Sequence, residues 1–174
     1  GRGDTFSKRA DLAMEVARQT PEVSFVMIMN PHEPEQQRRL CSLAPENVSV
    51  IERVEFHRVE DFYRRARVLL NTSTTEGFPN SFLQAGKYGV PIVSLSVDPD
   101  SMIRAHGCGK WAGNSVTAAA NQLRLLCSDD DLHASIGARC QKYVANHHEL
   151  TARVDQLAEL FRSVRDRQTA HTES

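Results

Sequence analysis

The sequence predicts an α/β fold with a doubly wound parallel sheet, and three observations support this prediction. Short apolar runs alternate along the chain with segments of helical periodicity, as they do in successive βαβ units. The first run, Val23–Met29, is almost continuously apolar, which is typical of a parallel strand covered on both faces. The chain has 174 residues, of which 40% are hydrophobic, enough for one domain with its own core.

The first half of the chain contains three predicted helices and three strands. The helix over residues 8–19 precedes Pro21, a stop signal, and its apolar face consists of Leu12, Ala13, Val16 and Ala17. After the strand Val23–Met29 come a short polar helix over 33–43 and a strand at Asn47–Ile51. Apolar residues at i, i+3, i+4 and i+7 then predict a third helix before the strand 68–70, namely Val59, Phe62, Tyr63 and Ala66.

The second half begins with a polar loop and a helix that ends at about Lys87. A strand follows at Pro91–Leu95, and we expect Asp98 or Asp100 to cap a helix that starts near Met102. Three more helices complete the prediction, at about 115–127, 129–147 and 150–166.

Composition and charge exclude several classes of protein. The net charge of −1 argues against a broad nucleic-acid-binding surface. The chain has no apolar run of membrane-spanning length and no signal-peptide pattern at its first residues, so we expect a cytoplasmic protein. The four cysteines are too scattered for a zinc site or a disulfide scaffold: Cys41, Cys108, Cys127 and Cys140.

The candidate binding site is the polar loop that follows the strand 68–70. Pro79 suits the first turn of the next helix, so that backbone amides point out of the helix N-terminus at the carboxyl edge of the sheet. Such amides form an anion cradle that fits a diphosphate. The residues that supply them are Gly77, Phe78, Asn80 and Ser81.

Two polar side chains flank this cradle. Glu76 directly precedes it, where a carboxylate can accept hydrogen bonds from sugar hydroxyls. Gln84 lies two helical turns further along, and its amide can both donate to and accept from ribose hydroxyls. Alternatively, Glu76 and Asn80 only cap a helix, and the residues alone leave both interpretations open.

The string Ser73–Val93 resembles the signature of glycosyltransferase family four, the retaining enzymes of GT-B fold. The shared pattern is a Glu, seven residues, a second acidic position, and then Ala-x-x-x-Gly-x-Pro-Val-Val. Here Gln84 stands at the second acidic position. The segments Phe62–Leu70 and 115–165 resemble the same family more weakly. The resemblance implies that the chain is the Rossmann-like, C-terminal, donor-binding half of a GT-B fold.

The resemblance also implies roles for individual residues. Glu76 would bind the hydroxyls of the donor sugar and stabilise the transition state, and Gln84 would contact the ribose. The amides of residues 77–81 would hold the diphosphate. Arg2 and Lys8 would neutralise the charge on the departing diphosphate; alternatively, they belong to a solvated basic helix start.

The implied reaction transfers a hexose from a nucleoside-diphosphate sugar to a glycan or a lipid-linked acceptor, as in polysaccharide biosynthesis. It proceeds with retention, without a cofactor and without an essential metal. The first predicted helix has no strand before it, although Gly1-Arg2 reads like the loop that leaves one. We therefore expect a first strand, and an N-terminal acceptor domain, outside this sequence, and we expect the isolated chain to be inactive.

Residues 1–166 are predicted to form the nucleotide-sugar-binding domain, and residues 167–174 a disordered tail. Any membrane association, at the inner membrane face, would depend on the N-terminal domain or on a lipid-linked acceptor. Two other functions stay open. One is a different enzyme of GT-B fold, such as a nucleotide-sugar epimerase or a phosphorylase, and the other is a non-catalytic module that binds a nucleotide or an anion.

Overall fold

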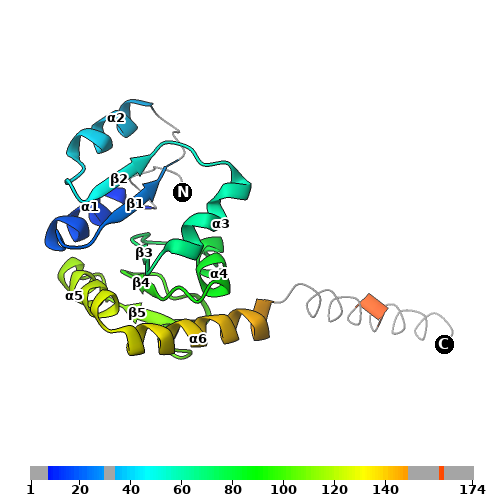
Figure 1. The fold of residues 1–174 in the computed structure, drawn as a ribbon. Coiled ribbons are helices and arrows are strands. Elements are labelled where there is room, and N and C mark those ends of the chain that lie inside the picture. Colours follow the sequence, from blue (N-terminus) through cyan, green and yellow to red (C-terminus); the bar gives the residue numbers. More distant parts are fainter. Residues whose placement is uncertain (1–7, 30–33, 149–160, 163–174) are drawn as a thin grey trace.

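The computed structural model of the chain describes residues 8–29, 34–148 and 161–162 (Figure 1). Helices and strands alternate along these ranges. The strands are β1 (Phe25–Ile28), β2 (Val48–Ile51), β3 (Leu69–Asn71), β4 (Ile92–Ser94) and β5 (Gly109–Trp111). The helices are α1 (Ala10–Gln19), α2 (Pro34–Leu43), α3 (Phe56–Arg65), α4 (Asn80–Lys87), the short 3-10 helix η1 (Pro99–Ser101), α5 (Val116–Ser128) and α6 (Asp130–His148).

All paired strands in the described residues are parallel, and they form two sheets. β1 pairs with β2, with Phe25 opposite Val48. The second sheet has the order β3-β4-β5, so that β4 lies in its middle. The predicted α/β class with parallel strands is confirmed, and the described strands divide between two sheets.

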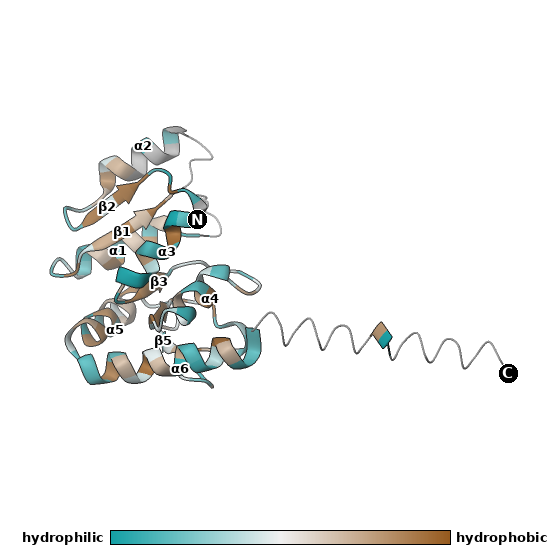
Figure 2. Cartoon of the chain, turned by 45° about the vertical axis from the view of Figure 1, so that its right-hand side comes forward, coloured by the Kyte–Doolittle hydropathy of each residue, from teal (hydrophilic) through white to brown (hydrophobic). Residues whose placement is uncertain are grey.

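The main hydrophobic core surrounds β4. Its three residues are fully buried, which explains why this part of the sequence is a continuous apolar run. Helices α4, α5 and α6 contribute further core side chains, among them Phe82, Leu126 and Ile136. Figure 2 shows the same distribution, since the strands are mostly brown and the helices carry both colours.

Two glycines let α4 and α6 approach each other closely. A Cβ at Gly86 of α4 would lie 2.6 Å from Cγ2 of Val144, and a Cβ at Gly137 of α6 would lie 2.4 Å from the carbonyl oxygen of Gly89. Both distances are shorter than packed atoms allow. The two glycines therefore fix the position of α4 against α6. This matters for the site, because α4 begins there.

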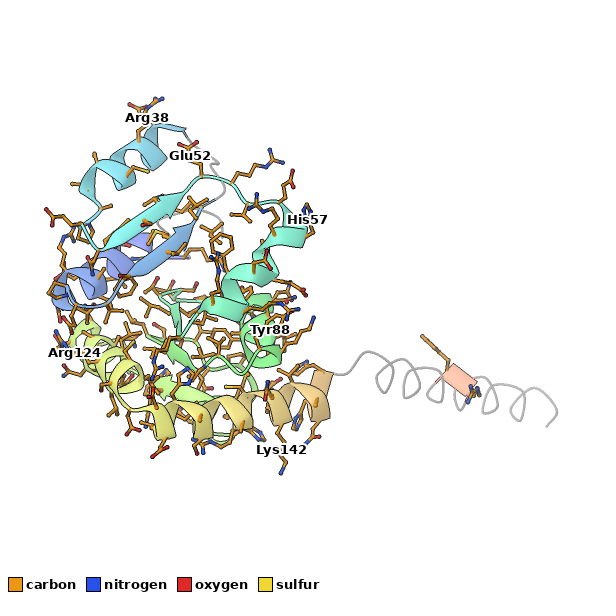
Figure 3. All side chains as sticks on the ribbon, in the orientation of Figure 1. Arg38, Glu52, His57, Tyr88, Arg124 and Lys142 are labelled. Carbon is orange, nitrogen blue, oxygen red and sulfur yellow. The ribbon has the colours of Figure 1, made fainter. Side chains whose placement is uncertain are left out.

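Helix α1 is held in place at its C-terminal end. The Asn47 side chain donates from Nδ2 to the carbonyl oxygens of Ala17 (3.0 Å), Thr20 (2.9 Å) and Val23 (2.8 Å). On α5, Arg124 donates from Nε to Oε1 of Glu22 at 2.7 Å (Figure 3). These hydrogen bonds join α1 and the turn after it to the residue before β2 and to α5.

The region after β4 differs from the prediction. The helix expected near Met102 is wrong, because the chain forms only η1 and a series of turns before β5. Asp98 precedes η1 but makes no side-chain cap to it, and its Oδ1 accepts instead from the Ile103 amide at 2.7 Å, in the turns that follow. β5 was not predicted.

The start of α4 also differs slightly from the prediction. Pro79 lies one residue before α4 rather than in its first turn.

Two predictions concern residues that the structure describes only in small part or not at all. Of the helix predicted over 150–166, only residues 161–162 are described, and they are helical. The predicted tail lies outside the described residues. Among the helices that are described, none combines the length and the apolar character that a membrane crossing requires.

Candidate functional site

The candidate site lies where β3 ends, at the carboxyl edge of its sheet. Three polar residues follow one another there, and all are buried: Asn71, Thr72 and Ser73. At the end of the neighbouring β4, the buried Ser94 donates from Oγ to the carbonyl oxygen of Val97 at 2.7 Å. Buried polar groups at a strand end are stable only when they are hydrogen-bonded. One of these groups, the Asn71 amide, donates to the Glu76 carboxylate.

The Glu76 carboxylate is the centre of the site. Its Oε2 accepts a hydrogen bond from Nζ of Lys8 at 2.6 Å, and its Oε1 accepts one from Nδ2 of Asn71 at 3.1 Å. The Glu76 side chain is 14% exposed and the Lys8 side chain 34% exposed. The two charges therefore form a largely shielded ion pair that still reaches solvent on the lysine side.

The surroundings of Glu76 keep it ionised. Burial raises the pKa of its carboxyl, but the hydrogen bonds from Lys8, Ser73 and Asn71 outweigh this effect and place the pKa below its ordinary value of 4.5. An ionised carboxylate only accepts hydrogen bonds. At neutral pH Glu76 can therefore accept hydrogen bonds from hydroxyl or ammonium groups, and it cannot donate one.

The main chain of Lys8 is also fixed at this edge. Thr72 donates from Oγ1 to the carbonyl oxygen of Lys8 at 2.9 Å, which holds the start of α1 against the end of β3. The next residue, Arg9, has a left-handed backbone with φ 48° and pairs with Asp11 at 2.8 Å. The cation that turns toward Glu76 is therefore Lys8 and not Arg9.

The amides at the start of α4 form the second part of the site. Phe82 donates its N–H to the carbonyl oxygen of Pro79 at 2.9 Å, which closes the first turn. Within the described residues, the N–H groups of Gly77, Phe78, Asn80 and Ser81 have no backbone acceptor. Such groups at a helix N-terminus carry partial positive charge, so the predicted anion site corresponds to amides without a backbone acceptor at this end of α4.

Open space surrounds the Cα of Gly77. A Cβ built there would meet no atom within 4 Å, so the packing of the protein does not itself require a glycine. The residue is exposed and directly follows Glu76. A ligand can thus approach the backbone at Gly77 without obstruction.

The remaining predicted residues lie around this centre. Ser81 borders a cavity beside β3, Asn80 is exposed, and the Phe78 ring packs on His148 at 4.6 Å between centroids. Gln84 is half-buried in α4, and no hydrogen bond within the described residues joins it to the Lys8–Glu76 pair. Arg2 lies outside the described residues.

Asn71 and Thr72 were not among the site residues predicted from the sequence. Asn71 orients the Glu76 carboxylate and Thr72 holds the Lys8 carbonyl. The available signal was their position, because they are polar residues directly after a buried strand. In the described part of the chain no group of three or more His, Cys, Asp or Glu side chains is arranged to hold a metal ion.

Comparison with known proteins identifies a matching family model and a set of similar structures. A family model described as glycosyl transferases group 1 matches residues 6–129. None of the curated proteins compared matches the sequence significantly. Among solved structures, the C-terminal domain of a glycosyl transferase group 1 family protein (LpcC) from Francisella tularensis is 17% identical, with a TM-score of 0.69. That match covers 86% of this chain and 84% of the other.

Two longer proteins give higher TM-scores. Sucrose-phosphate synthase from Thermosynechococcus elongatus is 17% identical with a TM-score of 0.82, over 94% of this chain and 44% of that protein. HepE from Anabaena, in complex with UDP, is 16% identical with a TM-score of 0.79, over 94% of this chain and 47% of that protein. The chain thus spans less than half the length of these two proteins. Its fold matches the C-terminal, Rossmann-like half of GT-B glycosyltransferases.

Proposed function

Since this chain belongs to the family of group 1 glycosyl transferases, we propose that it is the donor-binding half of a retaining hexosyltransferase. Its ligand is a nucleoside-diphosphate sugar, bound at the carboxyl edge of β3 and the N-terminus of α4. The Lys8–Glu76 ion pair at this edge is the observation that carries the proposal, because it sets one cation and one carboxylate beside an anion cradle.

Each group of the site suits one part of this ligand. The amides of residues 77–81 hold the diphosphate, since the start of a helix attracts negative charge. Lys8 approaches the same region and neutralises the charge that develops on the diphosphate as it leaves. Glu76 stays ionised and accepts hydrogen bonds from the sugar hydroxyls. Gln84, half-buried in α4, is the side chain that we assign to the ribose.

In the transfer step, the bond between the anomeric carbon and the diphosphate oxygen breaks, and its electron pair stays on the diphosphate. The acceptor oxygen bonds to the same carbon on the face that the diphosphate leaves, and its proton passes to the departing diphosphate oxygen. Glu76 stabilises the positive charge that develops on the sugar. We assign the acceptor to the N-terminal domain of the same enzyme. HepE is a structural neighbour in complex with UDP, which favours UDP as the first nucleotide to test.

Substitution of Glu76 tests the role of the carboxylate. In the variant Glu76→Gln we expect UDP to bind at least as tightly as in the unchanged chain, because Lys8 no longer pairs with a charged carboxylate. We expect the affinity for the cognate UDP-sugar to fall about tenfold, the value of one charged hydrogen bond. The matched control is Glu22→Gln, which removes another paired carboxylate, 2.7 Å from Arg124 and outside the site. Calorimetric titration measures both affinities.

The same experiment separates the competing functions. Equal binding of UDP and UDP-sugar by both variants would favour a module that only holds the anion. Conversion of the nucleotide sugar to an epimer by the isolated chain would favour an epimerase. Sugar transfer by the isolated 174 residues would contradict the assignment of the acceptor to a separate domain.

A further inference from the structure

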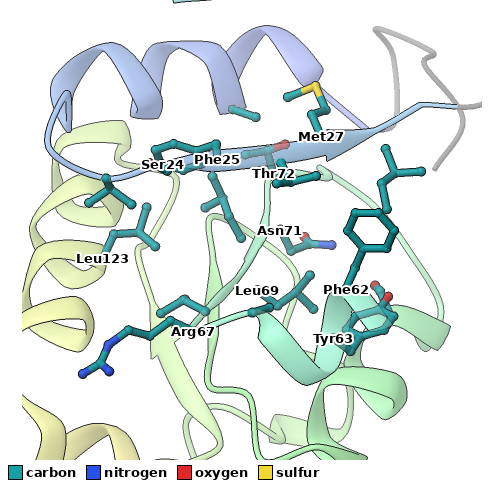
Figure 4. Close-up of a pocket in the computed structure, with 18 of the residues that line it drawn as sticks. Ser24, Phe25, Met27, Phe62, Tyr63, Arg67, Leu69, Asn71, Thr72 and Leu123 are labelled. Atoms are coloured by element: carbon teal, nitrogen blue, oxygen red, sulfur yellow. The ribbon is translucent and has the colours of Figure 1, made fainter. Parts of the chain in front are cut away.

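Three consecutive residues at the end of β3 contact both charged residues of the candidate site. They are Asn71, Thr72 and Ser73, and none of them is more than 8% exposed. All three border the cavity beside β3, where Figure 4 labels the first two. A buried amide or hydroxyl is unfavourable unless it is hydrogen-bonded. The groups to which these side chains donate therefore decide whether the segment is stable.

The three side chains divide between the two charged residues. Nδ2 of Asn71 donates to Oε1 of Glu76 at 3.1 Å, and the Ser73 hydroxyl is a further donor to the same carboxylate. Oγ1 of Thr72 donates instead to the carbonyl oxygen of Lys8, at 2.9 Å. Successive side chains of an extended segment point to opposite sides. This alternation directs residues 71 and 73 to Glu76, and residue 72 to the start of α1.

Thr20 provides a comparison, because its buried hydroxyl bonds locally. Its Oγ1 donates to the carbonyl oxygen of Val16 in the last turn of α1, at 2.9 Å. The Thr72 hydroxyl makes a bond of the same length to a residue 64 positions away, and that residue is the lysine of the ion pair. The bonds of residues 71–73 thus serve the site rather than the local main chain.

We propose that residues 71–73 are the positioning element of the donor site, a role that rests on the proposed function. Residues 71 and 73 direct the Glu76 carboxylate, and Thr72 places the main chain of Lys8. The element is itself held by the pairing of β3 with β4. One short piece of backbone therefore sets where the carboxylate and the start of α1 lie relative to each other before a ligand binds.

The two halves of the element act on different parts of the ligand. Lys8 serves the diphosphate, so Thr72 affects how tightly UDP binds. Glu76 serves the sugar, so Asn71 and Ser73 affect only the additional affinity that the sugar supplies. A segment that merely stabilised the fold would change both quantities together.

The first measurement needs no nucleotide. The carboxyl carbon of Glu76 is followed by ¹³C NMR over a series of pH values, with Glu76→Gln to assign its signal. Asn71→Leu and Ser73→Ala each remove a donor to the carboxylate, so the pKa of Glu76 should rise in both variants. In Thr20→Val, which removes a buried hydroxyl outside the site, it should not change. An unchanged pKa of Glu76 in both site variants would overturn the proposal.

Calorimetric titration with UDP, UDP-glucose and UDP-galactose then separates the two halves of the element. Thr72→Val should weaken binding of UDP about threefold to tenfold, the effect of one ordinary hydrogen bond, and Thr72→Ser should restore it. Asn71→Leu should leave UDP binding no weaker, and should lower the preference for the better-bound UDP-hexose over UDP by about the same factor. Thr20→Val should change neither quantity.

Two patterns of binding would contradict the proposal. One is a parallel loss of UDP affinity and sugar preference in both Thr72→Val and Asn71→Leu, and the other is failure of Thr72→Ser to restore UDP binding. Thermal unfolding shows which variants are folded, and Ser73→Ala replaces Asn71→Leu if that variant is not. If no nucleotide binds the unchanged chain, the proposed function fails, and the pKa of Glu76 alone decides the role of residues 71 and 73.

Discussion

Lys8 lies 2.6 Å from Glu76, so in the proposed site a diphosphate would compete with a carboxylate for this cation. A bound diphosphate offers more negative charge and also the amides at the start of α4. Lys8 can turn from Glu76 to the diphosphate while Asn71 continues to hold the carboxylate. Glu76 then has one oxygen available for a sugar hydroxyl.

Replacement of Lys8 by methionine is expected to weaken binding of UDP about tenfold to a hundredfold, because a hydrogen bond from a charged donor contributes about 1.5–3 kcal/mol. Calorimetric titration at constant salt gives the affinity. Lys142→Met is the matched control, since Lys142 is exposed on α6 and points away from the fold (Figure 3). Equal losses in both variants would mean that Lys8 acts only through the net charge.

Replacement of Gly77 by alanine tests whether this residue matters for ligand binding rather than for folding. A Cβ there meets no protein atom within 4 Å, so the midpoint of thermal unfolding should change by less than about 2 °C, as for a neutral surface substitution. Binding of UDP should weaken at least fivefold, because the methyl group occupies the path to the backbone. Unchanged binding would place the diphosphate elsewhere.

The lowered pKa of Glu76 predicts a pH dependence of stability. A group whose pKa is lower in the folded state stabilises that state above its unfolded pKa, and this contribution is lost as the pH falls through the folded pKa. The free energy of unfolding of the unchanged chain should therefore approach that of Glu76→Gln as the pH falls below about 4.5. Urea unfolding at a series of pH values measures this. A difference that stays constant down to pH 2 would contradict the assigned pKa shift.

At the scale of the residue, the sequence predicted Lys8 and Glu76 as candidate site residues but did not predict that their side chains are in contact. Lys8 and Glu76 were both predicted, but they are 68 residues apart, and their meeting depends on how α1 starts against β3. Asn71 was missed because the direction of a side chain at a strand end follows from the register of the sheet. That register is set by β4, and residue type alone does not reveal it.

At the scale of the elements, the helices with clear apolar faces were predicted within a few residues, as α1, α3, α5 and α6 show. β5 was missed because it has only three residues and begins with a glycine. A Cβ at Gly109 would lie 1.9 Å from the carbonyl oxygen of Ile92, so only glycine allows this strand to pair with β4. The helix expected near Met102 failed because Asp100 and Ser101 adopt left-handed backbone conformations.

Asn47 provides the test at this scale. Its side-chain amide donates to three carbonyl groups around the C-terminal end of α1. Asn47→Ala should lower the free energy of unfolding by about 1–3 kcal/mol, since it removes one hydrogen bond from each of three partly buried carbonyls. Asn47→Asp should lower it further at pH 7, because a carboxylate would face three carbonyl oxygens. Urea unfolding measures both variants, and equal stability of Asn47→Ala and the unchanged chain would show that water replaces the amide at no cost.

At the scale of the whole molecule, the described residues form an α/β unit that spans less than half the length of sucrose-phosphate synthase and HepE. The sequence predicted this α/β class because alternating helices and apolar runs permit few other arrangements. The division into two sheets was not predictable, because it depends on which strand edges meet in space. The proposed site lies at the carboxyl edge of the β3-β4-β5 sheet, the usual place for ligands in such folds.

The proposed function requires that this edge binds the diphosphate of a nucleotide sugar. Its most direct test is an NMR titration of the ¹⁵N-labelled chain with UDP, GDP, ADP and CDP. We expect that at least one nucleotide saturates the chain and that the largest amide shifts fall on Gly77, Phe78, Asn80 and Ser81. Saturation with shifts confined to another surface, or no saturation by any of the four, would contradict it.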